Sequence, residues 1–430
     1  MKVSVKYSAK AKKITIQVTE IDVAQMTQGA FHHSEKTIQQ IANRIGNELT
    51  RNMLESRDTT QATIERDGRT WYRKAASNGS YQTLYGTITL ARHLYQTGDG
   101  GKTCCPLEET CQLSFGGATP LLAELLAFKV SALTPGEVAQ DLAKHGLELS
   151  PSFIRQTAQR VGQIAVEKTP DWKLEAEPLQ DRVEVVATGF DGTTVPLRGE
   201  DYKEAMCGTI ALYNRHAERL STEYLGAMPE AGKADFTKRF TARVAQVTAL
   251  YPDALHVVLS DGARWNWQQI KEHYPKAVWI LDFWHAAQHL SEAADAIFGS
   301  EPNANKEAWF DRWKTTLRDE PNGVARVIRT LVRYRNQLGL SASSIKELDA
   351  QLNYFRTHAE RMQYADYTDA GLPIGSGVTE AGCKELIKTR FSRSGMRWNR
   401  DSGAKVLQLR AIRLSNQWDS FWSKVMRYVA

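Results

Sequence analysis

The stretch Val183-Glu-Val-Val-Ala-Thr-Gly-Phe-Asp191-Gly-Thr-Thr-Val195 decides the fold that we expect for this chain. Its β-branched residues predict a strand, and side chains alternate between the two faces of a strand. A second apolar run, residues 254–261, is typical of a buried strand that ends at Asp261 and a Gly turn. Because ligands gather at the strand ends of α/β sheets, Asp191 and Asp261 are candidate site residues.

The segments around these two strands predict a particular order of elements. We expect strands over residues 182–197, 207–214 and 219–228, a helix over 233–250, the strand that ends at Asp261, a short helix over 265–272 and a strand over 277–281. This order, βββαβαβ, is that of a ribonuclease-H-like fold. The first and fourth strands are neighbours in that fold, which would bring Asp191 and Asp261 together.

Helical patterns follow the last of these strands. They cover residues 286–298, 304–317, 323–338 and 341–364, are amphipathic, and are separated by Gly, Pro or Asn. We interpret them as an all-helical insertion.

A third acid, Glu380, follows the insertion. A Gly/Ser turn opens the stretch 373–398, and a helix is expected from about Thr379 to Gly395. One face of this helix would carry Glu380, Cys383, Lys384, Ile387 and Phe391. An acid that packs toward the sheet and is followed by basic residues suits a metal site that meets phosphates; these basic residues are Lys388, Arg390, Arg393 and Arg397.

The N-terminal third predicts a different kind of unit. Residues 1–115 form an accessory α+β region, with a strand at 13–19, a helix at 34–56 and strands near 85–95. Helices are then expected over 121–133, from Pro135 to about 146, and over 152–164, which is the spacing of a helix-turn-helix. The third helix would offer side chains able to contact DNA: Arg155, Gln156, Gln159 and Arg160. An ordinary three-helix bundle is the alternative.

Composition bounds the class of protein. The 430 residues are 42% apolar and carry a net charge of +6, which favours a polyanionic partner without requiring one. The five cysteines are odd in number and scattered, which argues against a disulfide framework and against a structural zinc site. Neither a membrane span nor a signal peptide is visible. We therefore expect a cytoplasmic, nucleoid-associated bacterial protein that contacts no membrane.

The acids allow one chemistry and several simpler interpretations. Magnesium binds carboxylate oxygens. Two ions about 3.5–4 Å apart can activate water on one side of a phosphodiester and stabilise the leaving oxygen on the other. Asp191-Gly and Asp261-Gly could equally be turns, and Glu380 could be a first-turn helix acid. Asp282 also follows an apolar strand and could replace Asp261. His285 is more often a hydrogen-bonded histidine than a ligand, and Trp284 is either core or a platform for an unpaired base.

Several short motifs together carry a family resemblance. They are Asp191-Gly-Thr, Ser260-Asp-Gly-Ala, Leu281-Asp-Phe-Trp-His285, Gly375-Ser-Gly-Val-Thr-Glu380 and Ser394-Gly-Met-Arg-Trp398. From about Tyr85 onward the chain resembles insertion-sequence transposases of the DDE type. It is most similar to the ISKra group and more distantly similar to Mutator-type enzymes.

The resemblance implies a function and a set of residues. Asp191, Asp261 and Glu380 would be the catalytic acids and the ligands of Mg²⁺ or Mn²⁺, as two ions. Asp282 and His285 would match the C/D-x-x-H signature of Mutator-type enzymes as supporting residues, with aspartate where many relatives have cysteine. The chain would cleave transposon-end DNA and join it to target DNA, acting as a homodimer or a larger assembly.

The expected organisation has five parts. An α/β, ribonuclease-H-like catalytic domain spans 180–285 and 371–430, the helical insertion spans 286–370, the helix-turn-helix spans 116–170, and the accessory region spans 1–115. Two alternatives use other functions: a ribonuclease-H-like nuclease or junction resolvase without strand transfer, and a DNA-binding protein without catalysis. The sequence leaves open the end sequence, the target site, cut-and-paste or copy-type pathway, and the role of residues 1–60.

Overall fold

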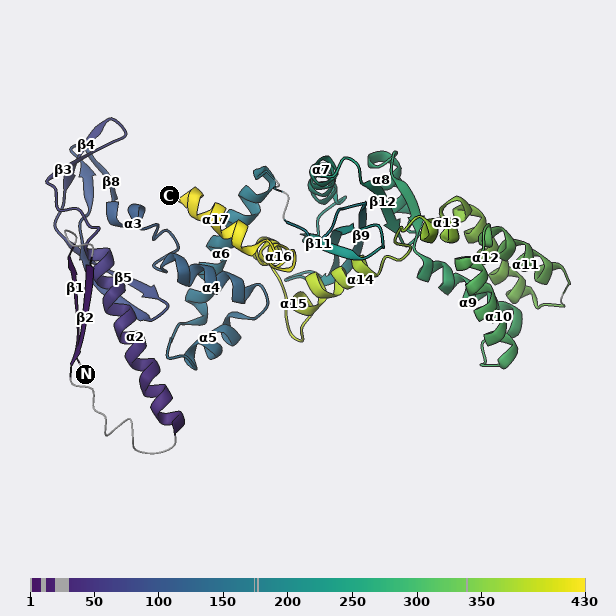
Figure 1. Ribbon diagram of the computed structural model, residues 1–430, viewed down its shortest axis with the longest axis horizontal. Coiled ribbons are helices and arrows are strands. Elements are labelled where there is room, and N and C mark those ends of the chain that lie inside the picture. Colours follow the sequence, from purple (N-terminus) through teal and green to yellow (C-terminus); the bar gives the residue numbers. More distant parts are fainter. Residues whose placement is uncertain are drawn as a thin grey trace. The chain divides into compact units, whose positions relative to one another are not determined.

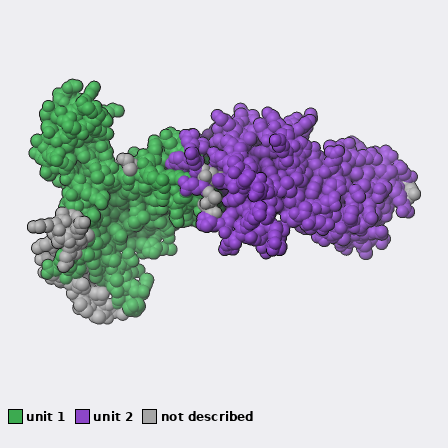
Figure 2. Space-filling model, turned by 45° about the horizontal axis from the view of Figure 1, so that its top comes forward, with its two compact units in different colours: residues 1–169, 408–430 green, residues 170–407 purple. Residues whose placement is uncertain are grey.

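The computed structural model divides the chain into two compact units. Unit 1 comprises Met1–Thr169 and Gln408–Ala430, and unit 2 comprises Pro170–Leu407 (Figure 2). The structure describes residues 2–8, 13–19, 31–173, 175, 178–337 and 339–429. We describe each unit by itself.

Unit 2 is built on a five-stranded mixed sheet (Figure 1). The strands are β9 (Val185–Pro196), β10 (Tyr202–Tyr213), β11 (Arg219–Ala227), β12 (Leu255–Ser260) and β13 (Val278–Leu281), and their spatial order is β11-β10-β9-β12-β13. The first three strands run antiparallel, whereas β12 is parallel to both β9 and β13. The expected neighbourhood of the first and fourth strands is therefore confirmed.

Helices cover one face of this sheet through aromatic packing. The ring of Phe190 on β9 contacts Phe236 and Phe240 of α7 (Ala234–Leu250), with ring centroids 6.4 and 5.7 Å apart. It also meets Trp265 of α8 (Arg264–His273) edge-on at 5.8 Å. Because neighbouring side chains on a strand point to opposite faces, Asp191 points to the other face.

A helix with a wide turn packs on that other face. It runs as α14 (Gly377–Gly382), a π segment η3 (Cys383–Lys388) and α15 (Thr389–Phe391). At Gly382 an added Cβ would lie 3.0 Å from Cys207 Sγ, so glycine lets the helix approach β10 closely. The helix ends at Phe391, four residues before the expected Gly395, which instead occupies a turn with φ of 75°.

The buried side of this helix differs from the expected face. Its buried residues are Thr379, Gly382, Cys383, Leu386, Ile387, Arg390 and Phe391. Glu380 and Lys384, which the expected face included, are exposed instead.

The chain between β13 and α14 is helical over most of its described residues. It forms α9 (Phe283–Phe298), α10 (Ala304–Asp319), α11 (Gly323–Gln337), α12 (Ala342–His358), a short 3₁₀ turn η2 (Ala359–Arg361) and α13 (Tyr364–Asp369). Side-chain caps fix three of the starts, since Asp282, Asn303 and Ser341 each accept a backbone N–H of the first turn. The expected helix end at Leu338 lies outside the described residues.

Unit 1 combines small sheets with helices. Its strands are β1 (Lys2–Ser8), β2 (Lys13–Thr19), β3 (Thr63–Arg66), β4 (Arg69–Arg73), β5 (Ser77–Thr83), β6 (Gly86–Arg92), β7 (Tyr95–Thr97) and β8 (Gly100–Cys104). Its N-terminal helices are α2 (Phe31–Glu55), α3 (Pro106–Thr110), α4 (Pro120–Val130), α5 (Pro135–Ala143) and α6 (Pro151–Lys168), with a 3₁₀ turn η1 (Thr169–Asp171) at its border.

Local signals explain the starts of α5 and α6. Thr134 and Glu137 form a capping box at the start of α5, and Pro135 occupies its first turn. The hydroxyl of Ser150 accepts the backbone N–H of Phe153 at 3.2 Å and caps α6. The expected trio of helices is therefore present with nearly the expected bounds.

The end of the chain belongs to unit 1. Helix α16 (Arg400–Leu414) leads into α17 (Trp418–Val429), whose Trp418 meets Phe128 of α4 edge-on at 5.0 Å. Arg410 donates a hydrogen bond to the Ser131 carbonyl at 3.0 Å. Residues 408–430 thus pack on the N-terminal helices, whereas the sequence assigned them to the catalytic domain. In the described part of the chain, no helix has the length and apolarity that crossing a membrane requires.

Candidate metal centre

The carboxyl ends of the parallel strands carry a row of three aspartates: Asp191, Asp261 and Asp282. Leu259 of β12 pairs with Gly189 of β9. Asp261 and Asp191 each lie two residues after this pair, so the register predicts that they lie side by side. Ser260 pairs with Leu281 of β13, which sets Asp261 opposite Asp282 in the same way. The register therefore predicts that these three acids, far apart in the sequence, lie near one end of the sheet, and the charge of Asp261 does act on Asp191.

Asp191 lies within β9 rather than at its end. The β9–β10 hairpin continues past the part of β9 that pairs with β12, which is why the strand does not stop at the acid. Its Oδ1 accepts the Gly192 N–H at 2.6 Å, and the Cys383 thiol lies 3.8 Å from its Oδ2. Burial, and to a lesser degree the negative charge of Asp261, raise the pKa of Asp191 above its usual value.

Asp261 is held in the turn after β12. Its Oδ1 accepts the Ala263 N–H at 3.0 Å and the side-chain amide of Asn266 at 3.1 Å. The buried Asn266 at the start of α8 was not singled out from the sequence, where a lone asparagine gives no signal. Asp261 therefore closes the turn that follows β12.

Asp282 is completely buried, with 0% exposure. Its Oδ1 accepts the His285 N–H at 2.8 Å and caps α9, and its Oδ2 accepts the backbone N–H of Ser376. Burial alone would raise the pKa of Asp282, but the hydrogen bonds from His285 and Ser376 outweigh it and lower the pKa to about 2. The carboxylate is therefore ionised at neutral pH.

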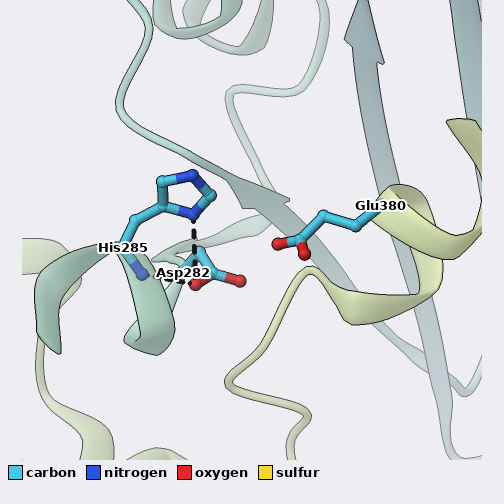
Figure 3. A group of neighbouring side chains, drawn as sticks. All are labelled: Asp282, His285 and Glu380. Carbon is cyan, nitrogen blue, oxygen red and sulfur yellow. Dashed lines mark hydrogen bonds and ion pairs between the residues drawn. The ribbon is translucent and has the colours of Figure 1, made fainter. Parts of the chain in front are cut away.

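His285 lies one turn into the same helix and faces Asp282. Its Nδ1 lies 3.3 Å from Asp282 Oδ1, which is the distance of an ion pair (Figure 3). This contact raises the pKa of His285 against the effect of burial, and the charges of Asp261 and Glu380 add to the rise. The ring thus lies in the field of three carboxylates.

Glu380 completes a cluster with this pair. Asp282, His285 and Glu380 each offer one ligand atom, and these atoms lie within 4.8 Å of one another (Figure 3). Glu380 is exposed, and its Oε1 accepts the Ser376 hydroxyl at 3.0 Å. The sequence grouped Glu380 with Asp191 and Asp261, whereas the compact cluster in the described residues contains the two residues assigned a supporting role.

The donor atoms of this cluster suit a divalent cation. Two carboxylates provide the hard oxygen ligands that Mg²⁺ prefers, and an imidazole nitrogen also suits Mn²⁺ and later transition metals. Asp282 is ionised, and the backbone N–H groups of His285 and Ser376 hold its carboxylate in place. The chemistry of Asp282, His285 and Glu380 therefore fits a divalent cation, although the sequence assigned the metal to Asp191, Asp261 and Glu380.

Trp284 lies beside the cluster and is 62% exposed. The interpretation of this side chain as core is therefore wrong: Trp284 lies on the exposed side of α9, whereas Phe283, Ala286 and Ala287 are buried.

The basic residues after Glu380 divide into two sets. Lys388, Arg393 and Arg397 are exposed, as a phosphate contact requires. Arg390 is only 2% exposed, and its guanidinium lies 4.9 Å from the centre of the Trp398 ring. Its burial against Trp398 and Met396 is at odds with the expected DNA contact.

The side chains expected to contact DNA from α6 are mostly on its surface. Arg155, Gln156 and Arg160 are exposed, whereas Gln159 is half-buried. The guanidinium of Arg160 lies against Gly116, where an added Cβ would collide with it.

Comparison with known proteins gives little further guidance. No protein-family model and no curated protein sequence matches the chain. Among solved structures, the chain is similar to one described as the Drosophila P element transposase strand transfer complex, with a TM-score of 0.25 and 11% sequence identity, over 71% of this chain and 80% of that one. A likeness at this level establishes neither fold nor activity, so the site itself must carry the functional argument.

Proposed function

We propose that the chain is a DNA transposase that cleaves transposon ends and joins them to target DNA in a metal-dependent reaction on a ribonuclease-H-like domain. The observation that carries the proposal is the row of aspartates at one sheet edge, faced by Glu380: Asp191, Asp261 and Asp282. The sheet order β11-β10-β9-β12-β13 supports the fold assignment. Weak similarity to a transposase adds no argument of its own.

Two neighbouring sets of residues would hold the cations. Asp282, His285 and Glu380 would hold one ion, and Asp191 with Asp261 would hold the other. A bound Mg²⁺ or Mn²⁺ would neutralise phosphate charge and lower the pKa of a coordinated water. Burial is the main cause of the raised pKa of Asp191, and the negative charge of Asp261 adds to it. A cation between the two carboxylates would offset this repulsion.

The protein's own residues would orient the reacting DNA. Asn266 and Ala263 fix the Asp261 carboxylate, and Asp282 fixes the His285 ring, so the polar groups are set before DNA arrives. Cleavage would free a 3′-hydroxyl, which would then attack a phosphodiester of target DNA by transesterification. Both ends of the element must be processed together, so the active form would be a dimer or a larger assembly.

DNA contacts would come from both units. Arg155, Gln156 and Arg160 of α6 would read the transposon end, since base contacts specify whereas phosphate contacts position. Lys388, Arg393 and Arg397 would neutralise phosphates near the cut.

The test is nicking of an end-labelled transposon-end duplex with Mg²⁺ or Mn²⁺. Glu380→Gln and Asp191→Asn should lower the nicking rate by at least about 100-fold, because each removes a ligand charge while keeping shape. The control is Glu385→Gln, a change to an exposed acid one turn further along the same helix. Full nicking by Glu380→Gln would overturn the proposal.

A pre-cleaved end separates the transposase from a nuclease or resolvase that uses the same acids. Joining of that end to a target plasmid supports the transposase. Nicking without any joining favours the nuclease.

A further inference from the structure

We propose that Ser376 is a positioning residue that holds Glu380 beside the Asp282–His285 pair. This inference rests on the proposed function, because it concerns the same metal centre. The backbone N–H of Ser376 donates to Asp282 Oδ2, and its hydroxyl donates to Glu380 Oε1 at 3.0 Å. One buried residue thus bonds two of the three members of the cluster.

The backbone of Ser376 is fixed to the start of α9. The Phe283 N–H donates to the Ile374 carbonyl at 2.9 Å, two residues before Ser376. Together with the bond from Ser376 to Asp282, this joins the Gly/Ser turn to the end of β13 at two points. The Ser376 hydroxyl is therefore a fixed donor relative to Asp282.

The Ser376 hydroxyl also does not make the hydrogen bond that serine usually makes at this position. Ser376 is the N-cap residue of α14, where a serine side chain normally accepts a backbone N–H of the first turn. Here it makes no such capping bond and donates to Glu380 instead. Helix α14 therefore lacks a side-chain cap, and the Ser376 hydroxyl holds the Glu380 carboxylate.

Glu380 needs this anchor because its side chain is exposed and has three rotatable bonds. Without the hydroxyl, the carboxylate would sample several rotamers and lie less often near Asp282. Residues that orient metal ligands in this way typically change metal affinity by about 10–100-fold when they are removed. The backbone N–H bond from Ser376 to Asp282 would survive a side-chain change, whereas the effect of the Ser376 hydroxyl on Asp282 would be lost with the hydroxyl.

The experiment is a Mn²⁺ titration of the full-length protein without DNA, followed by electron paramagnetic resonance. Ser376→Ala should weaken Mn²⁺ binding by about 10-fold or more, and Ser376→Thr, which keeps a hydroxyl, should restore much of it. Ser415→Ala is the matched control, because it removes a buried hydroxyl in unit 1. Ser376→Gly provides a second hydroxyl-free variant if the alanine variant does not fold.

The outcomes separate this inference from the proposed function. Weaker binding in the hydroxyl-free variants, with rescue by threonine and an unchanged control, supports the role of Ser376. If the wild type binds Mn²⁺ and Ser376→Ala binds it equally well, the role of Ser376 is overturned and the proposed metal centre is not. Wild-type protein that binds no Mn²⁺ overturns the proposed metal centre, and the inference with it.

Discussion

At the scale of single residues, burial and hydrogen bonding together decide how each ionisable group behaves. Asp282 stays charged although it is fully buried, because hydrogen bonds from His285 and Ser376 stabilise its carboxylate. His256 on β12 has no such charged partner: its Nε2 lies 3.1 Å from the Thr188 hydroxyl, and its ring meets Tyr274 edge-on at 5.5 Å. Burial lowers the pKa of His256 to about 4.

His256 should make the stability of the protein depend on pH. Its pKa in the folded state, about 4, lies below the ordinary value of 6.5, so only the unfolded chain binds the proton between these values. The neutral His256 side chain therefore contributes fully to the free energy of unfolding above pH 6.5, and this contribution is lost as the pH falls toward 4. The loss amounts to at most about 3 kcal/mol of the free energy of unfolding.

Urea unfolding at pH 7 and pH 4.5 measures this effect. His256→Gln should show a smaller decrease between the two pH values than the wild type. His216→Gln, a change at an exposed histidine, should leave the decrease unchanged. Equal pH dependence in wild type and His256→Gln would contradict the prediction.

At the scale of elements, the helix from α14 to α15 depends on close packing against β9 and β10. The Thr379 hydroxyl bonds the Thr209 hydroxyl at 2.7 Å, and Gly189 leaves the space that Thr379 occupies. A sequence pattern can predict this helix but not its π turn. The wide turn is compatible with burying Cys383 and Ile387 on the sheet while Glu380 stays at the rim.

Gly189→Ala should displace this helix. The added Cβ would collide with Thr379 Oγ1, and inserting a methyl group into a packed site typically costs about 1–3 kcal/mol. Chemical denaturation should therefore show a lower free energy of unfolding, and Mn²⁺ binding should weaken because Glu380 moves with the helix. Gly377→Ala is the control, since nothing lies within 4 Å of its Cβ position. Equal stability of the two variants would argue against close packing at Gly189.

At the scale of the whole molecule, the chain returns to unit 1 after completing unit 2. The final helix buries Trp418, Phe421 and Val425, and the Gln112 side chain donates to the Met426 carbonyl at 3.0 Å. The helices expected to bind DNA and the last helix of the chain therefore form one packed unit, although about 250 residues separate them in the sequence.

Deletion of residues 415–430 should selectively weaken unit 1. Burial of a large apolar side chain contributes about 1.5–3 kcal/mol, so loss of three should destabilise this unit by several kcal/mol. We expect lower affinity for transposon-end DNA in a gel shift and earlier proteolysis of residues 116–169, with Mn²⁺ binding retained. Tyr428→Ala, at an exposed position of the same helix, is the control. Unchanged end binding by the truncated chain would contradict this account.

The sequence by itself determined the local elements of this protein. A run rich in β-branched residues predicted β9, and a continuous apolar run predicted β12. Pro and Ser signals predicted the starts of α5 and α6, because these preferences act within a few residues. The same reasoning placed Asp191, Asp261, Asp282 and Glu380 near the ends of elements as candidate ligands.

Only the tertiary structure decided which of these residues meet. Strand register sets the three aspartates in a row, and the docking of α14 on the sheet groups Glu380 with Asp282 and His285. The same docking buries Arg390 against Trp398, although its neighbours in the basic run are exposed. Spacing along one helix or strand cannot predict which residues meet or become buried, because this depends on packing between segments that are distant in the chain.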